Sequence, residues 1–215
     1  MPHPKTLAGA ACLALLPLIA PAQEDFDPAR MEEVVRKYGT PGKEHKILAS
    51  WVGTWKTENT YWMTPEAPPM KSIGQSRCRM LMKGRYLSEL FSSESPEFGK
   101  FEGRATVAYD RLNKEYIHTW IDTMNTGMMI SRGKASEGGK SVEFKTVHKD
   151  SLTMQELKIR MVSHIGDPRE RKLEMFLTYP GKEEFKHMQI VYTKVTRAQK
   201  NKKKNERKAE DSAGS

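Results

Sequence analysis

Cysteines, long apolar runs and internal repeats are scarce or missing in this sequence. The 215 residues include only two cysteines, Cys12 and Cys78, which excludes a scaffold held together by several disulfides. No apolar run reaches the roughly 18 residues that a membrane-spanning helix needs. No repeat of about 20–50 residues indicates a solenoid or a propeller. We therefore expect one domain whose stability comes from its own core.

Recognisable catalytic motifs are also missing. Residues 74–78 (GQSRC) depart from the G-x-S-x-G pattern at the last position, and residues 133–141 are one residue too long for a P-loop. The second stretch also lies between two predicted strands, whereas a P-loop precedes a helix. Cys78 stands alone on an uncharged strand face, which is typical of an inert core thiol. No catalytic residue is predicted.

Ligands for a metal or a cofactor do not form a pattern. The histidines lack H-x-H, H-x-x-x-H and H-E-x-x-H spacings, so a structural zinc site is not expected. Met124, Met128 and Met129 are a weak match to soft copper(I) ligands and a better match to core residues. Residues 53–55 (GTW) also open nitrobindin-type haem barrels, but no histidine stands out as an axial ligand. We expect no metal and no cofactor.

The first 22 residues have the pattern of a secretory signal peptide. Lys5 supplies a weak positive charge, residues 7–19 are apolar, and residues 20–22 (APA) fit the small-x-small cleavage pattern. A membrane anchor is disfavoured because the apolar stretch is short and is interrupted by proline. Acylation of Cys12 is disfavoured because the residues before it lack the usual leucine. We expect export to the periplasm or the extracellular space, with Gln23 as the first mature residue.

Both ends of the mature chain are expected to lie outside the main domain. Residues 23–42 are predicted to form a helix and a linker, since Asp27 is an N-cap followed by Pro28 and Gly39 ends the pattern. Residues 197–215 carry seven positive and three negative charges without one aliphatic or aromatic side chain beyond alanine, which predicts a disordered basic tail. Such a tail suits solvation or weak contact with an anionic surface. It lacks the aromatic residues that stack on bases, so specific nucleic-acid binding is not expected.

Residues 43–196 are expected to form the main domain. A short helix is predicted over residues 43–52, ending at Gly53. Charged and uncharged side chains then alternate in runs that begin near residues 55, 74, 101, 142, 157 and 173, and glycine- or proline-containing turns separate the runs. This spacing predicts about eight to ten short strands joined by hairpins.

The strands are predicted to form a single antiparallel up-and-down β-barrel, an all-β fold preceded by short N-terminal helices. One charged face and one uncharged face per strand fit a barrel with solvent outside. A two-sheet sandwich is the alternative, but sandwiches usually need a long crossing connection, and the turns here are short.

The uncharged strand face differs from that of a filled core. Besides methionine and aromatic residues it contains small polar residues, including Thr57, Asn59, Ser76 and Thr146. A mixed lining of this kind suits a cavity for a small molecule. An ordinary core with a few hydrogen-bonded hydroxyls is the alternative.

Several stretches resemble one bacterial family, the domain of unknown function numbered 1579. They are residues 44–49 (EHKILA), 52–55 (VGTW), 62–70 (WMTPEAPPM), 84–87 (GRYL), 108–110 (AYD), 119–124 (TWIDTM), 126–129 (TGMM) and 185–193 (FKHMQIVYT). The resemblance spans about residues 42–194. It implies a lipocalin-like or calycin-like β-barrel that is often exported, and it brings no established activity.

The Gly-x-Trp signature of lipocalins is also present, because Gly53-Thr54-Trp55 opens the first predicted strand directly after a short helix. In lipocalins a cation from the last strand covers this tryptophan at the closed end. Lys194 is the expected cation here, with a contribution of about 0.5–1 kcal/mol. A plug of the barrel bottom is the simplest role for Trp55.

Trp120 and Asp122 are the most informative pair of candidate site residues. They lie two apart on one strand and therefore share a face. A carboxylate that points into the barrel must be paired or must bind a ligand. The opposite parity, with Ile121 inside, is equally open. The other residues expected to line a ligand site are Trp55, Asn59, Tyr61, Cys78, Tyr109, Met124, Met129 and Tyr192.

Three functions fit this pattern. The preferred one is an exported barrel that binds a small apolar or amphipathic molecule without transforming it. The second is an enzyme of unrecognised type that uses carboxylates or histidines inside the same barrel. The third is a surface-interaction protein that works through residues 197–215.

Overall fold

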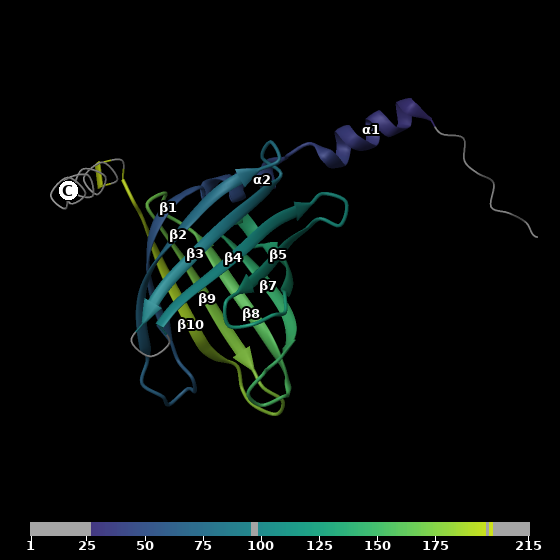
Figure 1. Cartoon of the computed structure of the whole chain (residues 1–215). Coiled ribbons are helices and arrows are strands. Elements are labelled where there is room, and N and C mark those ends of the chain that lie inside the picture. Colours follow the sequence, from purple (N-terminus) through teal and green to yellow (C-terminus); the bar gives the residue numbers. More distant parts are fainter. Residues whose placement is uncertain (1–26, 96–98, 197, 200–215) are drawn as a thin grey trace, which may run out of the picture.

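The computed structural model describes residues 27–95, 99–196 and 198–199 (Figure 1). The predicted signal peptide lies outside these residues, and so does the predicted basic tail apart from residues 198 and 199. Both stay predictions.

Two helices precede ten strands. The helices are α1 (Pro28–Gly39) and α2 (Lys43–Ser50). The strands are β1 (Gly53–Tyr61), β2 (Met70–Leu81), β3 (Tyr86–Ser95), β4 (Gly99–Asp110), β5 (Glu115–Asp122), β6 (Met129–Ala135), β7 (Ser141–Lys149), β8 (Glu156–Ile165), β9 (Glu170–Thr178) and β10 (Phe185–Lys194). A short 3-10 turn, η1 (Glu137–Gly139), connects β6 to β7.

Helix α1 begins as its sequence predicts. The Asp27 carboxylate accepts a hydrogen bond from the Ala29 N–H at 2.9 Å, and Pro28 occupies the first turn, where no N–H is needed. The helix has no buried residue and projects away from the barrel (Figure 1). No helix in the described part of the chain is long and apolar enough to cross a membrane.

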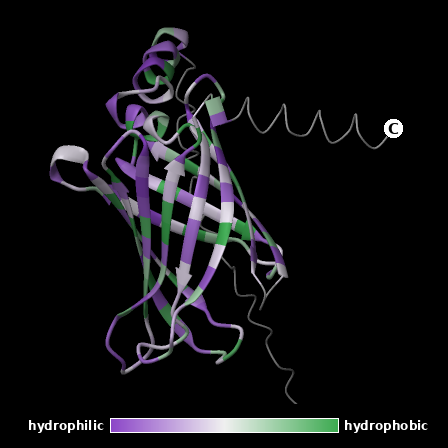
Figure 2. Cartoon of the chain, turned by 90° about the vertical axis from the view of Figure 1, so that its left-hand side faces the viewer, coloured by the Kyte–Doolittle hydropathy of each residue, from purple (hydrophilic) through white to green (hydrophobic). Residues whose placement is uncertain are grey.

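The ten strands form one closed antiparallel barrel. Each strand pairs with its neighbours in the sequence, and β1 closes the barrel by pairing with β10. The predicted up-and-down barrel is therefore confirmed, and the sandwich alternative is wrong. Hydrophilic and hydrophobic residues alternate along the strands, as Figure 2 shows, because successive side chains point to opposite faces.

The two ends of the barrel differ in burial. At one end, here called the closed half, α2 packs against β2, β3 and β4 and supplies Leu48, which is 0% exposed. Trp55 and Tyr116 lie beneath it at 1% exposure each. Toward the opposite end, here called the open half, inward side chains such as Trp120 and Met129 are only half-buried. The barrel is thus filled at the α2 end and accessible at the other.

Candidate ligand-binding sites

Trp55 anchors the closed half. Its indole N–H donates to the Trp51 carbonyl oxygen at 3.0 Å, which ties β1 to the turn that follows α2. The Lys194 ammonium lies 5.0 Å from the centre of the Trp55 ring. The predicted pairing of Lys194 with Trp55 is confirmed, and Trp55 is a structural plug.

A second cation in the closed half was missed by the sequence analysis. The Arg171 guanidinium lies 4.0 Å from the centre of the Tyr192 ring and 5.3 Å from that of Trp55. It also pairs with the Glu89 carboxylate at 3.2 Å, and the two side chains are only 9% and 11% exposed. A signal was present, since Arg171 has the same parity as the apolar residues that follow on β9. The alternation of charged and uncharged faces had favoured solvent exposure for the basic residues of the strands.

The Glu89 carboxylate joins a small polar cluster in the interior. The Ser76 hydroxyl donates to Glu89 at 2.5 Å, and the Cys78 sulfur lies 3.4 Å from the Ser76 hydroxyl. Cys78 is 3% exposed, and burial together with the nearby Glu89 charge raises the pKa of its thiol to about 12. A thiol with that pKa stays protonated at neutral pH, so Cys78 is unreactive, as predicted.

A small cavity of about 30 Å³ adjoins this cluster. It is lined by Trp51, Glu89, Val107, His118, Phe144, Met161, Ser163, His164, Arg171, Lys172, Leu173 and Tyr192. Three lining residues have a buried nitrogen without a partner: Trp51 Nε1, His118 Nδ1 and Arg171 Nε. The volume suits a water molecule, which would satisfy such groups, and is too small for an organic ligand.

The open half is organised around Trp120. Its ring stacks on Phe101 with 6.3 Å between ring centres and 18° between planes. The His118 ring stacks at 6.5 Å and 11°, and Phe91 meets Trp120 edge-on at 6.1 Å. These rings form an aromatic layer on the inner face of three neighbouring strands, β3, β4 and β5.

Asp122 fixes the orientation of Trp120. The Trp120 indole N–H donates to Asp122 Oδ2 at 2.8 Å, so the parity left open by the sequence is settled, with Asp122 on the inward face. The other carboxylate oxygen accepts the backbone N–H groups of Met124 at 2.9 Å and Asn125 at 3.1 Å. Both oxygens of Asp122 are thus hydrogen-bonded within the chain, which makes it a positioning residue.

The glycine at position 103 provides the space for Trp120. A Cβ atom there would lie 2.2 Å from Cζ2 of the Trp120 ring. Gly103 and Asp122 are direct partners in the β4–β5 register. The ring therefore lies flat against the backbone of β4 while Asp122 holds its N–H.

The remaining predicted site residues are divided between the two halves. Asn59 donates from Nδ2 to the Ser72 hydroxyl at 3.0 Å, and burial raises the pKa of the neighbouring Tyr61. Met129 pairs with Trp120 in the β5–β6 register, so it belongs to the open half. Tyr192, 3% exposed, belongs instead to the closed half.

Two further predicted site residues, Tyr109 and Met124, also lie away from the open half. Tyr109 packs between His45 of α2 and Tyr116, at 6.0 and 4.8 Å between ring centres, and so helps to hold α2 in place. Met124 was expected on the inward face beside Asp122, and this placement is wrong. Strand β5 ends at Asp122, where the chain turns, and Met124 is 65% exposed on the connection to β6.

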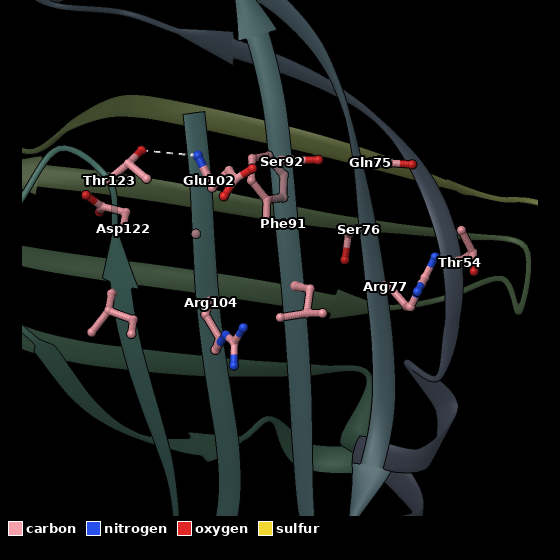
Figure 3. Close-up of a pocket in the computed structure, with 13 residues that line it drawn as sticks. Thr54, Gln75, Ser76, Arg77, Phe91, Ser92, Glu102, Arg104, Asp122 and Thr123 are labelled. Carbon is pink, nitrogen blue, oxygen red and sulfur yellow. Dashed lines mark hydrogen bonds between the residues drawn. The ribbon is translucent and has the colours of Figure 1, made fainter. Parts of the chain in front are cut away.

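A groove of about 520 Å³ lies on the outside of the barrel near these residues (Figure 3). It is lined by Thr54, Gln75, Ser76, Arg77, Leu90, Phe91, Ser92, Glu102, Gly103, Arg104, Ile121, Asp122 and Thr123. Most of these side chains point outward from β1 to β5. The alternation along the strands indicates inward-facing residues only, so this groove was not predicted. No group of three or more histidine, cysteine or carboxylate side chains in the described residues is arranged to hold a metal.

A closed ten-stranded antiparallel barrel, sealed by a helix at one end and lined by aromatic rings toward the other, defines a lipocalin-like barrel protein. The chain matches the family model "Protein of unknown function (DUF1579)" over residues 40–194 and belongs to that family. The resemblance identified in the sequence is confirmed.

Solved structures with the same fold support this class. The crystal structure of Rv2717c from M. tuberculosis is 14% identical, with a TM-score of 0.54, and the match covers 73% of this chain and 100% of that one. The S-type phycobiliprotein lyase CPES from Guillardia theta is 8% identical, also with a TM-score of 0.54, covering 71% and 93%. At these identities the likeness shows the fold alone. None of the curated proteins compared with the chain matches it.

Proposed function

We propose that this protein is an exported barrel that binds a small apolar or amphipathic molecule in its open half, against the face of Trp120. The observation that carries this proposal is that the Trp120 ring is partly exposed and is held in a fixed orientation. Asp122 holds its N–H at 2.8 Å, and Phe101 stacks on it. A large aromatic face that is held rigidly and is only half-buried binds an apolar ligand with little loss of side-chain entropy.

The surrounding residues suit such a ligand. Several inward positions on the strands of the barrel are aromatic or sulfur-containing, and they are half-buried rather than sealed. They include Tyr61, Met70, Phe101, Met129, Met175 and Met188. Methionine adapts its shape to an apolar partner, and aromatic rings supply large contact areas. The fold also occurs in a protein named a phycobiliprotein lyase, and a small-molecule role here is in keeping with that name.

Export is part of the proposal. Residues 1–22 have the three parts of a signal peptide, and Cys78 is the only cysteine after the expected cleavage point. The mature chain would begin at Gln23 in the periplasm or outside the cell. Protein purified from its own host should therefore have the mass of residues 23–215, and a chain that retains residues 1–22 would contradict export.

The binding site can be tested with Nile red, a neutral apolar dye whose fluorescence rises in apolar surroundings. Wild-type protein should bind the dye, and Trp120→Ala should weaken binding by about tenfold or more, because burying a large apolar side chain contributes about 1.5–3 kcal/mol. Tyr86→Ala is the matched control, since Tyr86 is an aromatic residue on the outer face with 41% exposure. Equal affinities in the wild type and Trp120→Ala would refute this site.

A further inference from the structure

The outer groove is built by the register of five strands. Direct partners Thr54, Arg77, Leu90, Arg104 and Ile121 form one outward row across β1 to β5. A second outward row, two residues further along each strand, contains Gln75, Ser92, Glu102 and Thr123. Figure 3 shows both rows, with Ser76, Phe91 and Asp122 on the line between them.

The groove is long and narrow. Five neighbouring strands span about 19 Å at the usual spacing of about 4.8 Å, and rows two residues apart lie about 7 Å from each other. Its volume of about 520 Å³ lies in the range of small-molecule sites. These dimensions favour an elongated molecule that lies across the strands.

One wall of the groove carries positive charge without a partner. Arg77 and Arg104 have no ion pair or hydrogen bond to an acidic group anywhere in the described residues. Each is the register partner of Leu90, so the two arginines flank it from either side. Glu102 on the opposite wall is already paired with the Lys100 ammonium at 2.8 Å. Asp122, the other acidic lining residue, accepts its hydrogen bonds from the Trp120 indole and from backbone N–H groups, so Arg77 and Arg104 are the lining charges left for a ligand.

Apolar side chains lie in the same outward row as the two arginines. Leu90 is 37% exposed and Ile121 is 43% exposed, although both lie on a face that is mostly polar. Two guanidinium groups on either side of one leucine can together bind a carboxylate, since each offers several N–H donors. An apolar chain attached to that carboxylate would extend over Arg104 toward Ile121.

We propose that this groove is a second binding site, specific for an elongated amphipathic carboxylate, with Arg77 and Arg104 holding the carboxylate and Leu90 and Ile121 contacting the apolar chain. The site lies on the outer face of the barrel and is separate from the site proposed at Trp120. A neutral molecule of the same length leaves both arginines unpaired and binds weakly.

Titration calorimetry with decanoate tests this site. The wild-type protein should bind decanoate, and the double variant Arg77→Gln/Arg104→Gln should bind it at least about tenfold more weakly, because hydrogen bonds to charged groups are lost. Arg79→Gln is the matched control, since Arg79 is an exposed arginine on the same strand that does not line the groove. In the Trp120→Ala variant, which lacks the contact proposed for neutral apolar ligands, decanol should bind much more weakly than decanoate.

Three outcomes would overturn the proposal: no decanoate binding by the wild type, equal affinity in the double variant, or equal loss in Arg79→Gln.

The Trp120→Ala variant separates the two sites. It should keep its affinity for decanoate, and a loss there would place the carboxylate inside the barrel. Arg77, Arg79 and Arg104 are exposed, so thermal unfolding of the arginine variants should show the same midpoint as the wild type.

Discussion

At the residue scale, several polar groups are buried in the barrel interior, where few hydrogen-bond or ion-pair partners are available. The Arg171–Glu89 pair is held at 3.2 Å in the closed half, with the ring of Tyr192 against the guanidinium. Removing one partner of a buried pair costs about 3–5 kcal/mol, because it leaves an uncompensated charge. His118 is different, because its Nδ1 is buried without any partner.

The pH dependence of stability is expected to reflect His118. Burial lowers the pKa of its imidazole to about 4, against an ordinary value of 6.5. Between these values the unfolded chain binds a proton that the folded chain does not, so stability is complete above pH 6.5 and falls as the pH drops toward 4. Burial also lowers the pKa of His45 and His187, which adds to the same slope.

Urea unfolding of wild type and His118→Gln at pH 7 and pH 5 measures this contribution. The wild type should lose more stability between the two pH values than the variant does, by about 1–2 kcal/mol. Equal losses would show that His118 is as easily protonated in the folded state as in the unfolded one.

At the element scale, glycines decide how closely strands and rings approach. Gly103 on β4 leaves room for the Trp120 ring of β5, and Gly133 on β6 lies so close to β7 that a Cβ atom would be 2.0 Å from the Glu143 carbonyl oxygen. At such positions glycine allows a strand to bend sharply, so that ten strands can close around a narrow interior.

Gly103→Ala tests whether β4 and β5 hold Trp120 as described. The added methyl group would displace the ring, strain the Trp120–Asp122 hydrogen bond and lower the free energy of unfolding by about 1–3 kcal/mol. Gly127→Ala is the control, because a Cβ there would have no atom within 4 Å. Urea unfolding compares the two variants. The same stability in both would mean that Trp120 moves without cost.

Much of this element-level structure could be predicted from the sequence. The period of two gave the strands and the barrel, Asp27 and Pro28 gave the start of α1, and the Gly-x-Trp pattern gave the contact between Lys194 and Trp55. The strands and the start of α1 depend on local spacing, which a sequence displays directly, whereas the Lys194–Trp55 contact followed from the resemblance to lipocalins.

Other features depend on contacts between distant strands and could not be read in the same way. Arg171 and Glu89 are 82 residues apart, and only the closed barrel brings them together. The sequence did not indicate which face of β5 points into the barrel, because both faces carry apolar residues. The outer groove depends on the register of five strands, which no single strand reveals.

At the scale of the whole molecule, the barrel has one sealed half and one accessible half. Helix α2 and Trp55 fill the sealed half, whose cavity of about 30 Å³ is too small for an organic ligand. The aromatic layer around Trp120 faces the accessible half, and the arginine groove lies outside. The two proposed sites therefore occupy opposite faces of the sheet formed by β1 to β5.

The central claim is that the open half of the barrel binds a small molecule. Native mass spectrometry of the mature chain, purified from its own host and measured before and after denaturation, tests it most directly. We expect a reproducible extra mass that leaves on denaturation and is absent from the Trp120→Ala variant. A bare chain mass in repeated preparations, or an extra mass that the variant retains, would contradict the claim.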